Sequence, residues 1–97
     1  MNEPPAILHG AHVLKYAIVD ASVVHTGRIT LHVGGEVLGP AAGLAICKYD
    51  RDNSFCLFYC NEKWDVLAAC GYPSMQMTLE MAEIAYRGVS EKWQSVV

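Results

Sequence analysis

The sequence predicts an α+β fold: an antiparallel β-sheet of four to five strands with one C-terminal helix packed across a face. Two observations lead to this prediction. Short runs rich in β-branched and aromatic residues, separated by turn residues, recur between residues 12 and 70. One later stretch, Met75–Arg87, contains strong helix formers and neither proline nor glycine. The 97 residues suit a single domain, in which residues 1–8 are expected to form a flexible tail.

The first half of the chain is expected to supply an opening strand and a hairpin. His12–Val19 has the composition of a strand. Arg28–Val33 alternates apolar and polar residues, which predicts a half-exposed strand. Gly34-Gly35 predicts a turn, and Glu36–Leu38 a short return strand.

A three-stranded meander is predicted next, from Ala42–Tyr49, Ser54–Asn61 and Trp64–Cys70, with polar turns between them. In the middle strand both faces are apolar: Phe55, Leu57 and Tyr59 point one way, and Cys56, Phe58 and Cys60 the other. This pattern predicts a strand covered on both sides.

The predicted helix has clear end signals. Ser74 can cap its first turn after Pro73, and Gly88 can end it because glycine adopts a left-handed conformation at little cost. Polar side chains fall on one narrow stripe, whereas apolar ones fill about 200° of the surface or more. Contact with one sheet needs an apolar stripe of only ~100°. Either a long loop or another subunit is therefore expected to cover the excess.

Composition supports extensive burial. The chain is 53% hydrophobic and only 18% charged, which predicts a homodimer or higher homo-oligomer that buries the second sheet face or the spare side of the helix. A net charge of −3 argues against a general affinity for nucleic acid. With no signal peptide and no membrane-spanning run, we expect a cytoplasmic, bacterial protein with reduced cysteines.

The cysteines favour packing over chemistry. If Tyr49 opposes Ser54, then Cys47 opposes Cys56, and Cys60 lies on the same face. Cys56 and Cys60 would then be about 13 Å apart, too far to bind one zinc ion. We therefore expect a core of free thiols, with Cys70 the more accessible one.

No metal site, cofactor or catalytic set is predicted. His9 and His12 have H-x-x-H spacing, but His9 lies in the expected tail. A carboxylate pair would need Asp20 beside Asp65 or Glu62, and no spacing brings them together.

One candidate ligand site remains. Methionine suits adaptable apolar surfaces, and aromatic residues can hold apolar or cationic ligands. The candidate ligand-binding residues are Phe58, Tyr59, Trp64, Met77 and Met81. The alternative interpretation of these residues is simple core packing.

The segments YDRDNSFCLFYCNEKWDVL and MAEIAYRGVSEKW resemble small uncharacterised bacterial α+β proteins of the integron and mobile gene cassette type. The resemblance spans Leu44 to Trp93. It implies an antiparallel sheet with one C-terminal helix and no known reaction. Many of these proteins carry a D-T-x-H-like segment before the helix, where this chain has residues 69–72, so any role of that segment does not transfer.

We expect a small non-enzymatic binding or interaction protein, a homo-oligomer that holds either a small apolar ligand or a protein partner. The ligand would lie at the sheet–helix or subunit boundary, and the partner would be met in an immunity- or antitoxin-like role. The alternative is a small enzyme with an intersubunit active site that uses Cys70 or an Asp/His pair.

Overall fold

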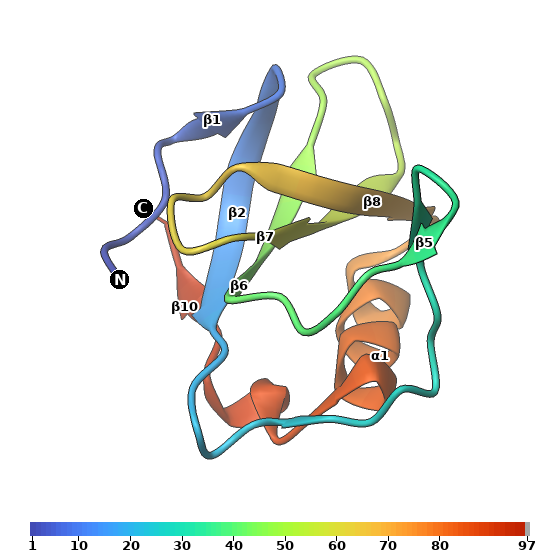
Figure 1. Cartoon of the computed structure of the whole chain (residues 1–97). Coiled ribbons are helices and arrows are strands. Elements are labelled where there is room, and N and C mark those ends of the chain that lie inside the picture. The colour runs from blue at the N-terminus through green and yellow to red at the C-terminus, as the bar shows by residue number, and fades with distance from the viewer. Residues whose placement is uncertain (97) are drawn as a thin grey trace.

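A curled antiparallel sheet and one helix make up the computed structural model, which describes residues 1–96 (Figure 1). The predicted α+β class is therefore confirmed. Five strands pair in the order β1-β2-β6-β7-β8, and β10 also pairs with β2. Their bounds are Ile7–Leu8 (β1), Ala11–Ile18 (β2), Gly43–Lys48 (β6), Phe55–Cys60 (β7), Val66–Tyr72 (β8) and Gln94–Ser95 (β10).

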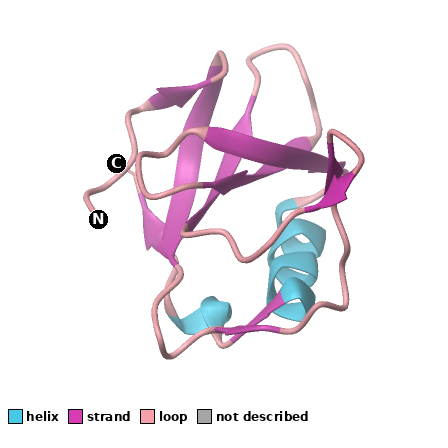
Figure 2. Cartoon of the chain, viewed as in Figure 1, coloured by secondary structure: helices cyan, strands magenta, loops and turns pink. Residues whose placement is uncertain are grey.

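The remaining elements are short, apart from helix α1, Met75–Ala85. Figure 2 shows this helix to one side of the strands. Two small ribbons pair Val24–His25 (β3) with Tyr86–Arg87 (β9), and His32–Val33 (β4) with Glu36–Val37 (β5). A 3-10 helix, η1, spans Val89–Glu91. Within residues 1–96, no helix combines the length and apolar character needed to cross a bilayer.

The predicted meander forms with the expected register. Strand β6 pairs with β7 so that Cys47 lies opposite Cys56. The turn before β7 is held by the carboxylate of Asp52, which accepts hydrogen bonds from the backbone N–H and the hydroxyl of Ser54 at 3.0 and 2.7 Å. A short polar side chain that bonds its own backbone two residues later is what makes such residues effective in turns.

Both faces of the central strands are buried, as predicted for β7. Residues that alternate along β6 and β7 enter two separate clusters because successive side chains point to opposite faces. The helix-side cluster contains Ala17, Val23, Ala41, Leu44, Ile46, Leu57, Tyr59, Ala82, Ala85, Tyr86 and Val89. The N-terminal-side cluster contains Leu8, Ala11, Val13, Tyr16, Ala45, Cys47, Phe58, Cys60 and Trp64.

The chain itself covers the second face of the sheet. Leu8 and Pro4 are buried, and β1 pairs with β2. The indole N–H of Trp64 donates to the carbonyl of Asn2 at 2.8 Å, and the N–H of Val13 donates to the carbonyl of Ala6 at 2.9 Å. The expected N-terminal tail thus lies against the body of the protein through specific contacts, and covers a face that the composition assigned to another subunit.

The helix begins as predicted and ends earlier. The hydroxyl of Ser74 accepts from the backbone N–H of Met77 at 3.1 Å, which caps the first turn. The prediction that the helix reaches Arg87 is wrong, since it ends at Ala85 and Tyr86 is extended. The reason is tertiary: Tyr86 and Arg87 pair with β3. Gly88 then turns the chain with φ of 95°, in the left-handed region.

The strand predicted over Arg28–Val33 is also wrong, since only His32–Val33 pairs. The alternation was nevertheless meaningful. Ile29 and Leu31 are partly buried against the helix-side cluster, whereas Arg28 and Thr30 are exposed. Residues 28–31 pack against this cluster without a paired strand among residues 1–96, so their side chains alternate although their backbone forms no ladder. The predicted Gly34-Gly35 turn is present, and both glycines have positive φ.

The carboxylate of Glu83 joins α1 to η1, which makes stability depend on pH. It accepts from the backbone N–H groups of Gly88 and Ser90 at 2.8 and 3.0 Å. Burial opposes the ionised form, but these hydrogen bonds outweigh it and hold the pKa of Glu83 below its ordinary 4.5. Its stabilising effect is therefore fully present above pH 4.5 and is lost as the pH falls through the lower folded-state pKa.

We expect Glu83→Gln to lower the free energy of unfolding at pH 7 by about 1 kcal/mol, with the difference from wild type shrinking below pH 4.5. Urea denaturation at pH 7 and pH 3.5 measures this. Glu80→Gln is the matched control, because Glu80 is exposed and, among residues 1–96, its side chain accepts a hydrogen bond from Gln76 alone. Equal losses at both pH values for Glu83→Gln would contradict the capping role.

Candidate functional site

A small cavity lies at the boundary between the sheet and the helix. Three residues with polar rings line it, His25 on β3, Tyr59 on β7 and Tyr86 on β9. The other lining residues are Ile29, Leu31, Leu38, Gly39 and Ala85. The enclosed space is about 10 Å³, near the size that one water molecule needs. Counting the open space at its mouth, the hollow reaches about 210 Å³. We call it the tyrosine cavity.

Tyr59 carries the most unusual group at this site. Strand β7 lies between β6 and β8, and its alternation directs Tyr59 to the helix side, where only 1% of the residue is exposed. The phenol oxygen is buried and has no hydrogen-bond partner among residues 1–96. Burial raises the pKa of Tyr59, so the hydroxyl stays protonated at neutral pH. A buried hydroxyl of this kind costs roughly 1–3 kcal/mol unless something pairs with it.

Tyr86 places a second phenol against the same cavity. Its oxygen accepts a hydrogen bond from the backbone N–H of Ala41 at 2.8 Å, which leaves its own proton available to donate. Burial raises the pKa of Tyr86 despite that bond, so it too is neutral. The two tyrosine rings lie 6.2 Å apart between centroids, and the His25 ring lies 5.0 Å from that of Tyr86.

One wall of the cavity is the segment of residues 29–38, here called the flap. It contains the β4–β5 hairpin, closed by a hydrogen bond of 2.7 Å from the N–H of Leu38 to the carbonyl of Leu31. Within residues 1–96, no strand of the main sheet pairs with the flap. Just before the flap, the N–H of Thr26 donates to the carbonyl of Ala85 at 3.0 Å. This bond attaches the chain that leads into the flap to the end of α1.

The structure does not bring the five predicted ligand-binding residues together in one pocket. Phe58 and Trp64 belong to the N-terminal-side cluster, and Tyr59 belongs to the helix-side cluster across the sheet. On α1, Met77 is 42% exposed and Met81 is partly buried. Of the five, only Tyr59 lines the tyrosine cavity.

Sequence reasoning missed His25 and Tyr86. The residues around His25 had no clear pattern, and Tyr86 was counted as part of the helix. The available signal was Gly88 two residues later: had the helix been ended one turn before that glycine, Tyr86 would have stood out as a free aromatic residue in A-Y-R-G.

The cysteines are free thiols packed mainly in the core. Cys47 and Cys60 are buried, and burial raises the pKa of each to about 12. At neutral pH they are therefore thiols, whereas nucleophiles and metal ligands are thiolates. Cys56 and Cys70 are partly exposed, and Cys70 lies on β8 opposite Leu57.

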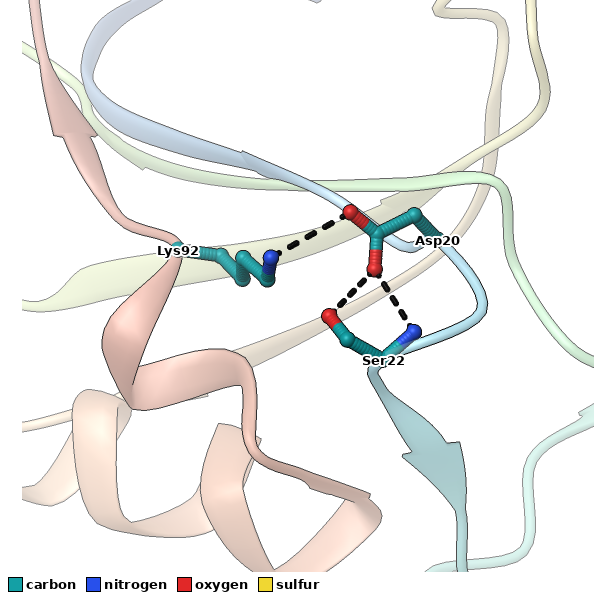
Figure 3. Close-up of polar contacts among 3 residues, drawn as sticks. All are labelled: Asp20, Ser22 and Lys92. Carbon is teal, nitrogen blue, oxygen red and sulfur yellow. Dashed lines mark hydrogen bonds and ion pairs between the residues drawn. The ribbon is translucent and has the colours of Figure 1, made fainter.

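The acidic candidates serve turns. Asp20 accepts from the backbone N–H of Ser22 at 2.9 Å and from its hydroxyl, and its other oxygen lies 3.3 Å from the Lys92 ammonium (Figure 3). These contacts, mainly those from Ser22, hold the pKa of Asp20 below its ordinary value. Asp65 instead accepts from the amide of Asn61 at 3.1 Å, so the structure does not pair it with Asp20.

The Asp/His pair that the structure does form is on the surface. His12 Nε2 and Asp50 Oδ1 are 2.8 Å apart, with side chains 51% and 81% exposed. Within residues 1–96, no three histidine, cysteine or acidic side chains gather closely enough to hold a metal ion. Comparison with protein-family models, curated proteins and solved structures found no match to this chain.

Proposed function

We propose that this protein is a non-enzymatic binding protein that holds a small, mainly apolar ligand in the tyrosine cavity. The observation that carries the proposal is the buried hydroxyl of Tyr59, which has no hydrogen-bond partner among residues 1–96 and belongs to a residue that lines the cavity. Ligand pockets are typically concave and apolar, with a few convergent polar groups that fix orientation. The tyrosine cavity lies at the sheet–helix boundary, which is one of the two places where we expected a ligand, the other being a subunit boundary.

The polar groups define the class of ligand. Tyr59 and Tyr86 both have a proton to donate, and no acidic or lysine side chain lines the cavity among the described residues. The complementary group is a neutral hydrogen-bond acceptor, such as a ketone or amide carbonyl, on an apolar body. Entry requires the flap to move outward, since the enclosed space holds only about one water molecule.

A pair of probes tests this chemistry. Cyclohexanone and methylenecyclohexane have the same shape, but only the first carries an acceptor oxygen. We expect two-dimensional amide NMR titrations to show binding of cyclohexanone at Tyr59, Ala85 and Tyr86, and binding of the hydrocarbon at least fivefold weaker. A screen of carbonyl compounds by thermal shift then extends the search to larger ligands.

Tyr59→Phe removes the proposed donor and should have two opposite effects. The variant should lose the preference for the ketone over the hydrocarbon. It should also be more stable, with a free energy of unfolding about 1 kcal/mol higher than that of wild type, because a buried unpaired hydroxyl has been removed. The binding titration and urea denaturation measure the two effects.

Tyr16→Phe is the matched control. The hydroxyl of Tyr16 donates to Gln94 at 3.0 Å in the N-terminal-side cluster, so its loss should lower stability and leave binding unchanged. Failure of cyclohexanone to bind wild-type protein at millimolar concentration, or equal ketone preference in wild type and Tyr59→Phe, would refute the proposal.

The other functional predictions stay predictions. A protein partner in an immunity- or antitoxin-like role, and an enzyme built on Cys70 or an Asp/His pair, have no specific observation in their favour. The predicted homo-oligomer needs a different surface from the second sheet face, because residues 1–8 and Trp64 cover that face.

A further inference from the structure

The two edges of the sheet differ in how well they are protected. On one side β1 and β10, of two residues each, share the outer edge of β2, and Pro4-Pro5 precedes β1. Short strands and proline are common ways of blocking an edge against further pairing. The other edge is β8, the last strand in the order, with seven residues.

Strand β8 lacks the usual protection. It contains no charged residue and no proline, and each of its seven residues is at least partly exposed. Among residues 1–96, no hydrogen bond joins its backbone to any element except β7. In Figure 1 the strand crosses the front of the molecule, between the turn after β7 and the start of α1. An uncharged strand with a row of unpaired N–H and C=O groups is a template for another strand.

We propose that β8 pairs antiparallel with β8 of a second copy of this chain, so that the two sheets become continuous across a two-fold axis at Ala69. Antiparallel pairing about one residue is self-complementary, as a two-fold interface requires. This register places small residues at the centre, with Ala68 of one copy opposite Cys70 of the other. It places the bulky Leu67 opposite Gly71.

The ends of β8 favour the same partner. Asp65 precedes the strand and Pro73 follows it. In the proposed register, Asp65 of one copy lies opposite Pro73 of the other copy. The two Asp65 side chains are therefore at opposite ends of the ladder. A parallel pairing would place the two Asp65 side chains next to each other, where like charges destabilise a sheet. Pro73, which has no N–H to donate, limits the ladder to the seven residues of β8.

A matched pair of lysine variants tests the interface. Ala69 and Ala21 are both exposed, but Ala21 lies in the loop after β2. We expect sedimentation analysis at about 10–100 μM to show that wild type and Ala21→Lys dimerise, since small interfaces belong to weak complexes. Ala69→Lys should weaken dimerisation at least tenfold, because two ammonium groups would meet on the axis. Circular dichroism checks that each variant is folded.

Hydrogen exchange on wild-type protein makes the test independent of any variant. Amides of β8 should gain protection between 1 and 200 μM, while exposed amides of the flap should not. A monomer at all concentrations, or dimers of Ala69→Lys as tight as wild type, would overturn the proposal. So would dissociation by Met77→Lys alone, since this would place the interface on the exposed side of α1, where Met77 and Ile84 lie.

Discussion

Replacing Trp64 by alanine is expected to lower the free energy of unfolding by about 3–5 kcal/mol, much of the ~5–15 kcal/mol available to a small domain. The indole ring is buried in the N-terminal-side cluster and packs edge-on against Tyr16, with centroids 5.9 Å apart. Its N–H also holds the carbonyl of Asn2. The variant loses the ring, a hydrogen bond and the attachment of the N-terminal segment together.

Urea denaturation gives the magnitude, and hydrogen exchange shows whether the N-terminal segment is released. Trp64 has φ of 64°, a left-handed conformation that alanine shares at similar cost, so the loss reports on the side chain. Trp64→Phe keeps an aromatic ring and loses the N–H, and should cost less than half as much. A loss below ~1 kcal/mol for Trp64→Ala would contradict the packing described for this ring.

The parts of the fold set by local patterns were predictable from sequence. The meander over β6, β7 and β8 follows from alternating residues and polar turns, and the start of α1 follows from Ser74. The two-sided burial of β7 was also visible, since apolar residues occupy both of its faces. These features depend on residues close together in the sequence, where side-chain periodicity and turn chemistry act directly.

Features set by distant pairing were not predictable in this way. Gly88 could have signalled an earlier end to the helix, but no local pattern indicates that Tyr86 then pairs with His25, about sixty residues earlier. For the same reason the tyrosine cavity was missed, although Tyr59 itself was a candidate. The sheet does have apolar residues on both faces, as the composition suggested. Part of the second face is covered by the N-terminal segment of the same chain, whose polar start suggested a free tail.

Gly43 lies in close contact with Trp64 and Met1, two of the residues that cover the second face of the sheet. It lies at the start of β6, between Ile18 of β2 and Cys60 of β7. A Cβ atom there would be 2.7 Å from two ring atoms of Trp64 and 2.8 Å from the end of Met1. Met1 is flexible and can move, but the buried indole ring cannot. The Trp64 ring therefore leaves no room for a side chain at position 43, where glycine is required.

We expect Gly43→Ala to destabilise the protein by about 1–3 kcal/mol, the usual range for overpacking. Without a clash, the same change in a strand stabilises by roughly 0.5–1 kcal/mol, because the unfolded chain loses freedom. Gly71→Ala is the matched control, since a Cβ atom on that strand residue meets nothing within 4 Å. Urea denaturation should therefore give changes of opposite sign for the two substitutions.

A double-mutant cycle assigns the clash to its partner. Trp64→Leu removes the two ring atoms that a Cβ atom at position 43 would meet, so Gly43→Ala should cost little or nothing in that background. Additive losses in the double variant would show that the destabilisation comes from the strand backbone or from Met1. Coupling of at least ~1 kcal/mol would show that Gly43 and Trp64 act as one packing unit, through which the chain covers its own second sheet face.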